Sequence, residues 1–372
     1  MQKKKDPSAA KAPDKFRSAR IYDPLRSSAD IKVIELERRR RQAFHQEERR
    51  LAGISGRAAL TITILSSLYI LALEQYQPLA DLLSTHSFRG YALEMLMVAG
   101  VLPVLASVLI VLLEKPAKSI VFGDRPSFTP SLLAFMSGFP LAFIGLTLDH
   151  LVSHFFTTNT FLQLPGWDLM NQGVMLFQSS WLQIALTIIV SSVLPALGLS
   201  FLLNGLILPG LAAGSYYTRA ILMTAFFATL MPMQLRPLPV FFIFAVFICK
   251  VRLDSNSLIT SSLASLGLGL GWLTYPLAYQ FTADVFWGQL PSSTSQIISL
   301  QLPLLFLSAM IFLPILVYYT NYRNRRKVEE REKALLDVSK QGEVVGYRRK
   351  VDYVFVFSTI LMSMILLVQS VI

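Results

Sequence analysis

The sequence predicts an all-α, polytopic membrane protein with about nine transmembrane helices. Hydrophobic residues make up 53% of the 372 residues and charged residues 15%, whereas a soluble domain carries about 25% charged residues. Runs such as AALTITILSSLYILAL and VFVFSTILMSMILLV hold no charge, and about 20 apolar helical residues cross a bilayer core. Because Lys and Arg gather in a few segments, the formal charge of +11 indicates membrane topology and not nucleic-acid binding.

Residues 1–56 are predicted to form a basic cytoplasmic tail that is partly helical. Its first part is rich in Pro, Ala and Lys and predicts disorder. Its second part, IKVIELERRRRQAFHQEERRLAG, places Glu35 four residues before Arg39 and Glu37 four residues before Arg41, a spacing that stabilises a helix. The thin apolar stripe of this helix favours a solvated helix over one that lies on anionic lipid or on a partner.

The membrane domain is predicted to cover residues 57–320, and a basic cytoplasmic loop at 321–351 separates it from a C-terminal transmembrane helix at 352–372. Pro195 in the fourth span predicts a bend or break there. The apolar runs place the spans at 57–75, 91–113, 130–149, 179–208, 218–233, 237–251, 257–279, 297–320 and 352–372.

The distribution of basic residues predicts the orientation. With the tail in the cytoplasm, only Arg89 and Arg236 of the 34 Lys and Arg residues fall on the outer side. The C-terminus then lies at the outer face. The bacterial inner (plasma) membrane is the simplest compartment, with membrane lipids and another membrane protein or complex as expected partners. The loops assigned to the cytoplasm are 114–129, 209–217, 252–256 and 321–351.

Asp149, His150 and His154 are the candidates for a metal site. The two histidines are four residues apart and share one helix face, a spacing that can bind zinc. No HExxH glutamate lies between them, and a third ligand would have to come from elsewhere, such as Asp168. We therefore expect Asp149, His150 and His154 to be polar residues at the membrane interface, and we expect the chain to bind no metal and no other cofactor.

Three short segments share the spacing of a known family. They are Leu199-Ser200-Phe-Leu-Leu-Asn204-Gly after Pro195, Phe227-Ala-Thr-Leu-Met231, and Ser265-Leu-Gly-Leu-Gly269. Residues 178–275 thereby resemble the core of the CPBP (CAAX protease and bacteriocin-processing) family of intramembrane proteases. The positions that correspond to the family's glutamate pair, arginine, two histidines and asparagine are Leu199, Ser200, Asn204, Met231, Ser265 and Gly269.

The resemblance implies a protease scaffold, and the residues at these positions imply that its chemistry is lost. In the family, the carboxylate and imidazoles polarise a water for attack on a peptide carbonyl, a task that needs a base or a metal. No Glu, Asp or His occurs from 169 to 253, and a serine without a base is a poor nucleophile. A pseudoprotease that binds a membrane protein partner or hydrophobic client, as a subunit or assembly factor of a complex, is the main expectation.

Two alternatives remain open. The interrupted fourth span and the Gly-rich segment SLASLGLGLGW fit a transporter or a lipid-binding protein, because unwound helices line substrate sites in transporters. An active intramembrane endopeptidase would have to use displaced residues such as Asp149, His150 and His154.

Overall fold

The structure is a computed structural model that divides into two compact units, Met1–Glu47 and Glu48–Ile372. The clusters, cavities and polar networks described below all belong to the second unit. The residues that the structure describes are 28–76, 93, 95–155, 181–214, 216–231, 238–287, 294–337 and 352–371.

The described residues are helical almost throughout, and no strand occurs among them, which confirms the all-α class. Helix occupies at least part of every range predicted to cross the membrane. Segments named η are π-helices, with one extra residue in each hydrogen-bonded turn. The elements are α2 (Ser28–Gln75), η1 (Leu96–Val101), α5 (Leu102–Glu114), α6 (Lys118–Phe122), α7 (Phe128–Phe155), α9 (Trp181–Ile188), η3 (Ile189–Val193), α10 (Leu194–Leu199), η4 (Ser200–Ile207), α11 (Leu208–Gly214), α12 (Tyr217–Leu230), α13 (Leu238–Ser255), α14 (Leu258–Trp287), α15 (Thr294–Asp337) and α16 (Tyr353–Val371).

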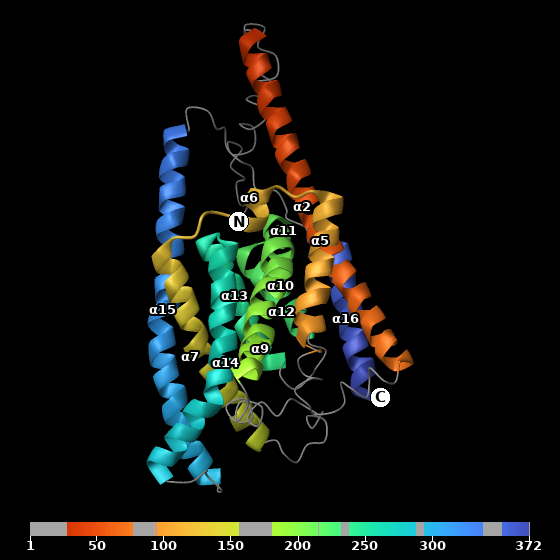
Figure 1. Cartoon of the computed structure of the whole chain (residues 1–372). Helices are drawn as coiled ribbons and strands as arrows, with labels where there is room; N and C mark the ends of the chain where they lie inside the picture. Colours follow the sequence, from red (N-terminus) through yellow and green to blue (C-terminus); the bar gives the residue numbers. More distant parts are fainter. Residues whose placement is uncertain are drawn as a thin grey trace, which may run out of the picture. The chain divides into compact units, whose positions relative to one another are not determined.

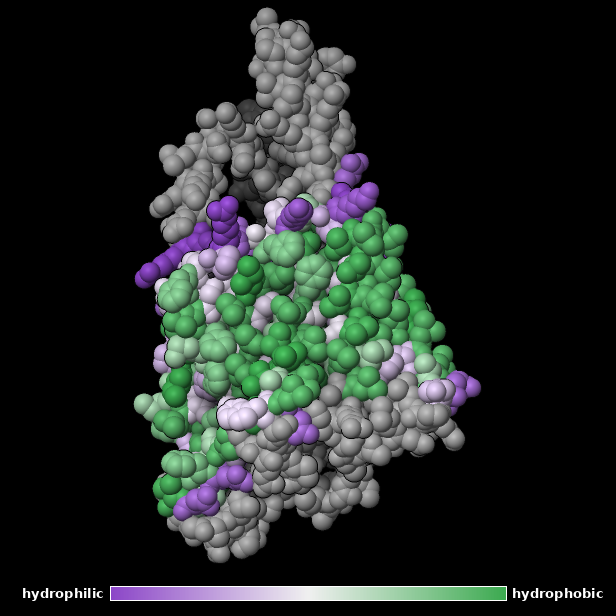
Figure 2. Space-filling model, in the orientation of Figure 1, coloured by the Kyte–Doolittle hydropathy of each residue, from purple (hydrophilic) through white to green (hydrophobic). Residues whose placement is uncertain are grey.

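Six of the described helical stretches are long and apolar enough to cross a membrane, so the chain is an integral membrane protein by this measure. Apolar side chains cover most of the coloured surface in Figure 2, as expected where lipid replaces water. Helices α12 and α16 offer shorter apolar stretches, and α13 carries three charged residues near its end. The six stretches are Arg49–Gln75, Leu96–Glu114, Phe128–Asp149, Trp181–Ala213, Leu258–Val285 and Ser299–Arg326.

The buried apolar side chains form two main clusters. The first joins α2, α5, η4, α11, α12 and α16 and includes Ile62, Leu206 and Phe355. The second joins α7, α13, α14 and α15 around Phe244 and Phe247. Helix α13 contributes to both clusters, through Cys249 in the first and Phe244 in the second. It therefore holds the two halves of the membrane domain together (Figure 1).

Helices α7 and α14 pack side by side at close range (Figure 1). A Cβ added at Gly267 would lie 1.9 Å from the carbonyl oxygen of Phe135, and one added at Gly138 would lie 2.2 Å from the amide nitrogen of Leu268. Small residues permit this approach of two backbones, as in many membrane helix pairs. Gly267, within the Gly-rich segment, thus serves the packing of α14 against α7.

The fourth predicted span is continuous through Pro195 and is not broken. Helical turns run from Trp181 to Gly214, and the irregularity takes the form of two π-helical segments, η3 and η4, on either side of α10. A proline lacks the N–H that an α-helical turn needs, and π turns accommodate such a mismatch without a break. π-helical turns are frequent at functional sites, and both segments here border the same cavity.

The loop predicted at 252–256 is mostly helix. Helix α13 continues to Ser255, and α14 begins at Leu258, so Asn256 and Ser257 make the whole connection. Asn256 takes a left-handed conformation (φ 51°), which asparagine tolerates better than most residues. The two charged residues of this segment, Arg252 and Asp254, therefore lie buried in a helix and not in a solvated loop.

Candidate functional site

A cavity of about 190 Å³ lies where the two apolar clusters meet. Its walls come from η3, α10 and η4 on one side and from α13 and α14 on the other, with the start of η1 and the end of α12 completing the lining. Of the described residues that line it, none carries a carboxylate, imidazole, amine or guanidinium. Serine, asparagine and cysteine side chains, with the Trp272 N–H, supply the polar groups of an otherwise apolar lining.

The structure brings to this one cavity all six positions that correspond to the motif residues of the resembled family, a set that we call the family frame. They come from three segments of the chain and meet although Leu199 and Gly269 are far apart in sequence. Asn204 and Met231 are buried, as is Ser200. The residues so placed are Leu199, Ser200, Asn204, Met231, Ser265 and Gly269.

Polar side chains of the cavity bond to one another and to the backbone. The hydroxyl oxygens of Ser200 and Ser265 are 3.1 Å apart, and Ser265 also donates to the carbonyl oxygen of Ser261 at 3.2 Å. The Cys249 thiol donates to the side-chain oxygen of Asn204 at 3.6 Å. Each of these hydroxyl and thiol groups thus has a neutral partner, and no described residue of the lining is a base that could make it a nucleophile.

An aromatic wall closes one side of the cavity, and no motif in the sequence indicates it. The rings of Phe241 and Trp272 stack at 5.8 Å with an interplanar angle of 7°, and Phe244 meets Trp272 edge-on at 6.0 Å. Such residues are common in apolar helices, so composition carries no signal. The spacing of Phe241 and Phe244, three residues apart on one helix face, is the feature that could have indicated a shared wall.

The candidates for a metal site do not join this cavity. Asp149 lies near the end of α7 and does not line it. The side chains of His150 and His154, and all of Asp168, lie outside the described residues. Among the residues that the structure does describe, no three His, Cys, Asp or Glu side chains group as metal ligands.

Next to the cavity, a buried arginine compensates for an unpaired backbone carbonyl. The Leu208 N–H donates to the carbonyl oxygen of Leu203, five residues back, in the π-helical pattern. In the same pattern the Asn204 carbonyl oxygen would accept a hydrogen bond from residue 209, but this residue is a proline and has no N–H. The Nε atom of Arg252 donates to this Asn204 oxygen at 3.0 Å and satisfies it.

The same guanidinium joins α13 to α6. One terminal nitrogen of Arg252 donates to the carbonyl oxygens of Ile120 and Val121, both at 3.1 Å, and the other donates to the Asn256 side chain at 3.3 Å. The Arg252 side chain is fully buried, with 1% of the residue exposed. Its position therefore fixes η4, and with it Ser200 and Asn204, relative to α13.

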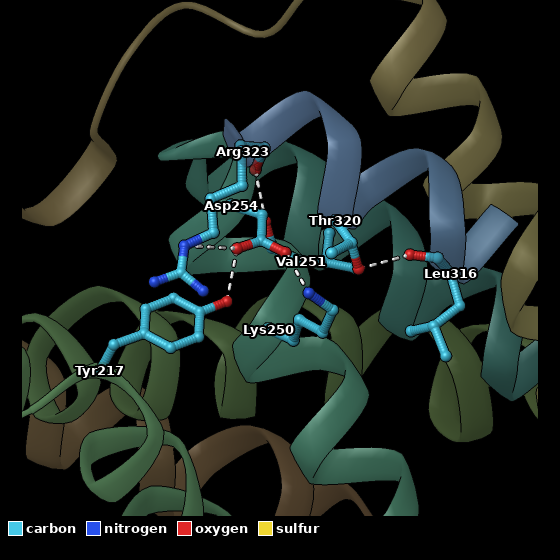
Figure 3. A network of polar contacts seen from close by, with 8 residues as sticks. Tyr217, Lys250, Val251, Asp254, Leu316, Thr320 and Arg323 are labelled. Carbon is cyan, nitrogen blue, oxygen red and sulfur yellow. Dashed lines mark hydrogen bonds and ion pairs between the residues drawn. The ribbon is translucent and has the colours of Figure 1, made fainter. Parts of the chain in front are cut away.

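A second buried charge, Asp254, connects three helices (Figure 3). Its carboxylate accepts hydrogen bonds from Tyr217 of α12 and from Lys250, the latter at 2.6 Å, and it forms an ion pair with Arg323 of α15 at 3.7 Å. The Arg323 guanidinium carbon lies 3.4 Å from the centre of the Tyr217 ring, within the range of a cation–π contact. We call these four residues the Asp254 cluster.

Residues from all four loops predicted to share one side of the membrane lie together. Asp124 accepts from Asn256 at 3.2 Å and pairs with Arg326, which joins the loops at 114–129, 252–256 and 321–351. The Asp254 cluster adds Tyr217, from the loop at 209–217. The chain therefore folds with these polar segments at one common end.

Comparisons of the chain with protein-family models, with curated proteins and with solved structures find no match.

Proposed function

We propose that this chain is a non-catalytic integral membrane protein with a CPBP-like core, a pseudoprotease, that binds a hydrophobic segment of a membrane client in its apolar cavity. One observation carries the proposal. The six positions that the family resemblance assigns to catalysis line a single cavity, and none of them holds a carboxylate or an imidazole that could act as a base or hold a catalytic zinc.

The size of the cavity limits the chemical groups that it can bind. About 190 Å³ is too small for a helix but sufficient for one apolar side chain or the end of an alkyl chain. The lining offers an aromatic wall of Phe241, Phe244 and Trp272 against such a group. We infer that the client presents one large apolar side chain from its own membrane helix.

The proposed topology has nine spans, with the N-terminus in the cytoplasm, the C-terminus at the outer face, and the bacterial inner membrane as the compartment. The grouping of four loops at one end supports this arrangement, because an even number of crossings then separates each from the next. We also propose that α13 crosses the membrane, although it contains three charged residues. Lys250, Arg252 and Asp254 all lie in its last turns, and each has a hydrogen-bond partner there.

We expect Ala245→Leu to weaken client binding about 10- to 150-fold, because the larger side chain occupies part of the cavity that Ala245 lines and excludes a client side chain whose burial is worth about 1.5–3 kcal/mol. A photoreactive phenylalanine analogue at position 241 should give a discrete cross-linked membrane protein in cells, and Ala245→Leu should reduce the yield of that product. The matched control is Ala72→Leu, which adds the same groups at an exposed position of α2.

A second control places the same analogue at position 306, where Phe306 is 70% exposed on α15. The proposal fails if positions 241 and 306 give the same products, or if Ala245→Leu and Ala72→Leu have equal effects. Appearance of a cleaved client that depends on His150 and His154 would instead indicate an active site built on those displaced residues.

A further inference from the structure

A second, polar cavity of about 670 Å³ lies at the end of the membrane domain where the basic loops meet. It is formed by the loop before α7, the connection between α13 and α14, and the part of α15 that follows Tyr318. Its volume falls in the range of about 300–1,000 Å³ that is typical of small-molecule sites. The apolar cavity does not share any of its lining residues.

The charge of this cavity is positive. Arg125, Arg325 and Arg326 line it, and Asp124 is the one acidic residue among the described residues of the lining. Asp124 is already paired, because Arg326 and the Asn256 amide both donate to it. With the residues whose side chains the structure describes, Arg125 and Arg325 form no ion pair or hydrogen bond, and both guanidinium groups line the cavity where a ligand could reach them.

The rest of the lining adds donors suited to phosphate oxygens. The cavity includes Ser127 and Ser257, which directly precede the first residues of the long helices α7 and α14. Helix N-termini carry partial positive charge, which favours a nearby anion; at α14 the Thr260 N–H already donates to the Ser257 hydroxyl oxygen at 3.4 Å. Tyr318 and Tyr322 contribute phenol groups from α15, where aromatic side chains with a polar end are suited to the headgroup region.

We propose that this cavity binds a phosphate-bearing anion, namely the headgroup of an anionic phospholipid. The arginine fork matches the geometry of phosphate oxygens, and basic cavities between helix ends bind anionic headgroups. The position of the cavity, at the end of the membrane-spanning stretches, places it at the depth of lipid phosphates. This inference does not depend on the function proposed for the apolar cavity.

The test uses the full-length protein, delipidated in neutral detergent and returned to nanodiscs of phosphatidylcholine with increasing phosphatidylglycerol. Native mass spectrometry should show one saturable phosphatidylglycerol per chain that survives mild activation, with phosphatidylcholine not retained. Arg125→Gln and Arg325→Gln should each weaken retention about fivefold and the pair about thirtyfold, since each arginine near a headgroup contributes about 1 kcal/mol. Both side chains are exposed, so neither change should affect folding.

Arg219→Gln is the matched control, because Arg219 is exposed in the first turn of α12 and does not line the cavity. The proposal is overturned if both lipids are retained equally, or if the double variant behaves like Arg219→Gln. Free glycerol phosphate distinguishes the source of the ligand. If it saturates the site without lipid at millimolar concentration, the site takes a soluble phosphate and the membrane assignment is wrong; if it does not, the lipid headgroup is the ligand.

Discussion

Replacing Asp254 with asparagine is expected to lower the free energy of unfolding by about 3–5 kcal/mol. The carboxylate is buried, with 1% of the residue exposed; it accepts hydrogen bonds from Tyr217 and Lys250 and forms an ion pair with Arg323. An amide of the same shape keeps the volume but removes the negative charge. Two cations, whose side chains are 19% and 26% exposed, are then left without their acid, which costs more than the loss of one hydrogen bond.

Unfolding by sodium dodecyl sulfate in mixed micelles, followed by circular dichroism, measures this effect. Asp284→Asn is the matched control, because Asp284 is an exposed carboxylate of α14 and should change the unfolding free energy by no more than about 0.5 kcal/mol. Equal unfolding curves for the two variants would show that the Asp254 cluster does not stabilise the packing of α12, α13 and α15.

Arg252→Leu is expected to cost about 3 kcal/mol, because it leaves the carbonyls of Ile120, Val121 and Asn204 without their donor. The structure also predicts a partial rescue. Pro209→Ala introduces an N–H at the position that should serve the Asn204 carbonyl, so in the Arg252→Leu background it should restore about 1 kcal/mol.

A double-mutant cycle on these two positions isolates that coupling from the general effect of replacing a proline. The expected result is that Pro209→Ala stabilises the Arg252→Leu protein more than it stabilises the unmodified chain. Additive effects would mean that Arg252 and Pro209 do not act on the same carbonyl, and that Arg252 does not stabilise the π-helical turn of η4.

The helices could be predicted from the sequence because each uncharged run is long enough to cross a bilayer. Within a bilayer, a helix satisfies all the backbone hydrogen bonds of such a segment. The π-helical segments around Pro195 could not, since no residue type marks the register of a π turn. Proline indicates that the helix must deviate, but a break and a π turn both accommodate the missing donor.

The charged end of α13 shows a second limit of sequence reasoning. A solvated loop is the expectation for Arg252 and Asp254, because charges next to an apolar run usually lie in water. Their partners come from α6, α12 and α15, which no local pattern connects. The spacing of Lys250 and Asp254, four residues apart with opposite charge, is the one local sign that the helix continues.

The resemblance to the CPBP family stays a prediction, but the six positions that it singles out all line one cavity. The family frame indicates Ser200 and Ser265 by spacing alone, and the structure places their hydroxyls 3.1 Å apart. The frame does not indicate the aromatic wall, because Phe and Trp are interchangeable with other large apolar residues in a membrane helix until their packing is known.

Cys249 makes the apolar cavity open to direct observation in the unmodified protein. It is the single cysteine of the chain, it lines the cavity, and 2% of it is exposed. Any thiol-reactive dye that labels the folded protein therefore reports on this one wall, with no background to remove by mutagenesis. The labelling rate then measures how often the cavity admits the reagent, and a bound occupant is detected because it slows the labelling.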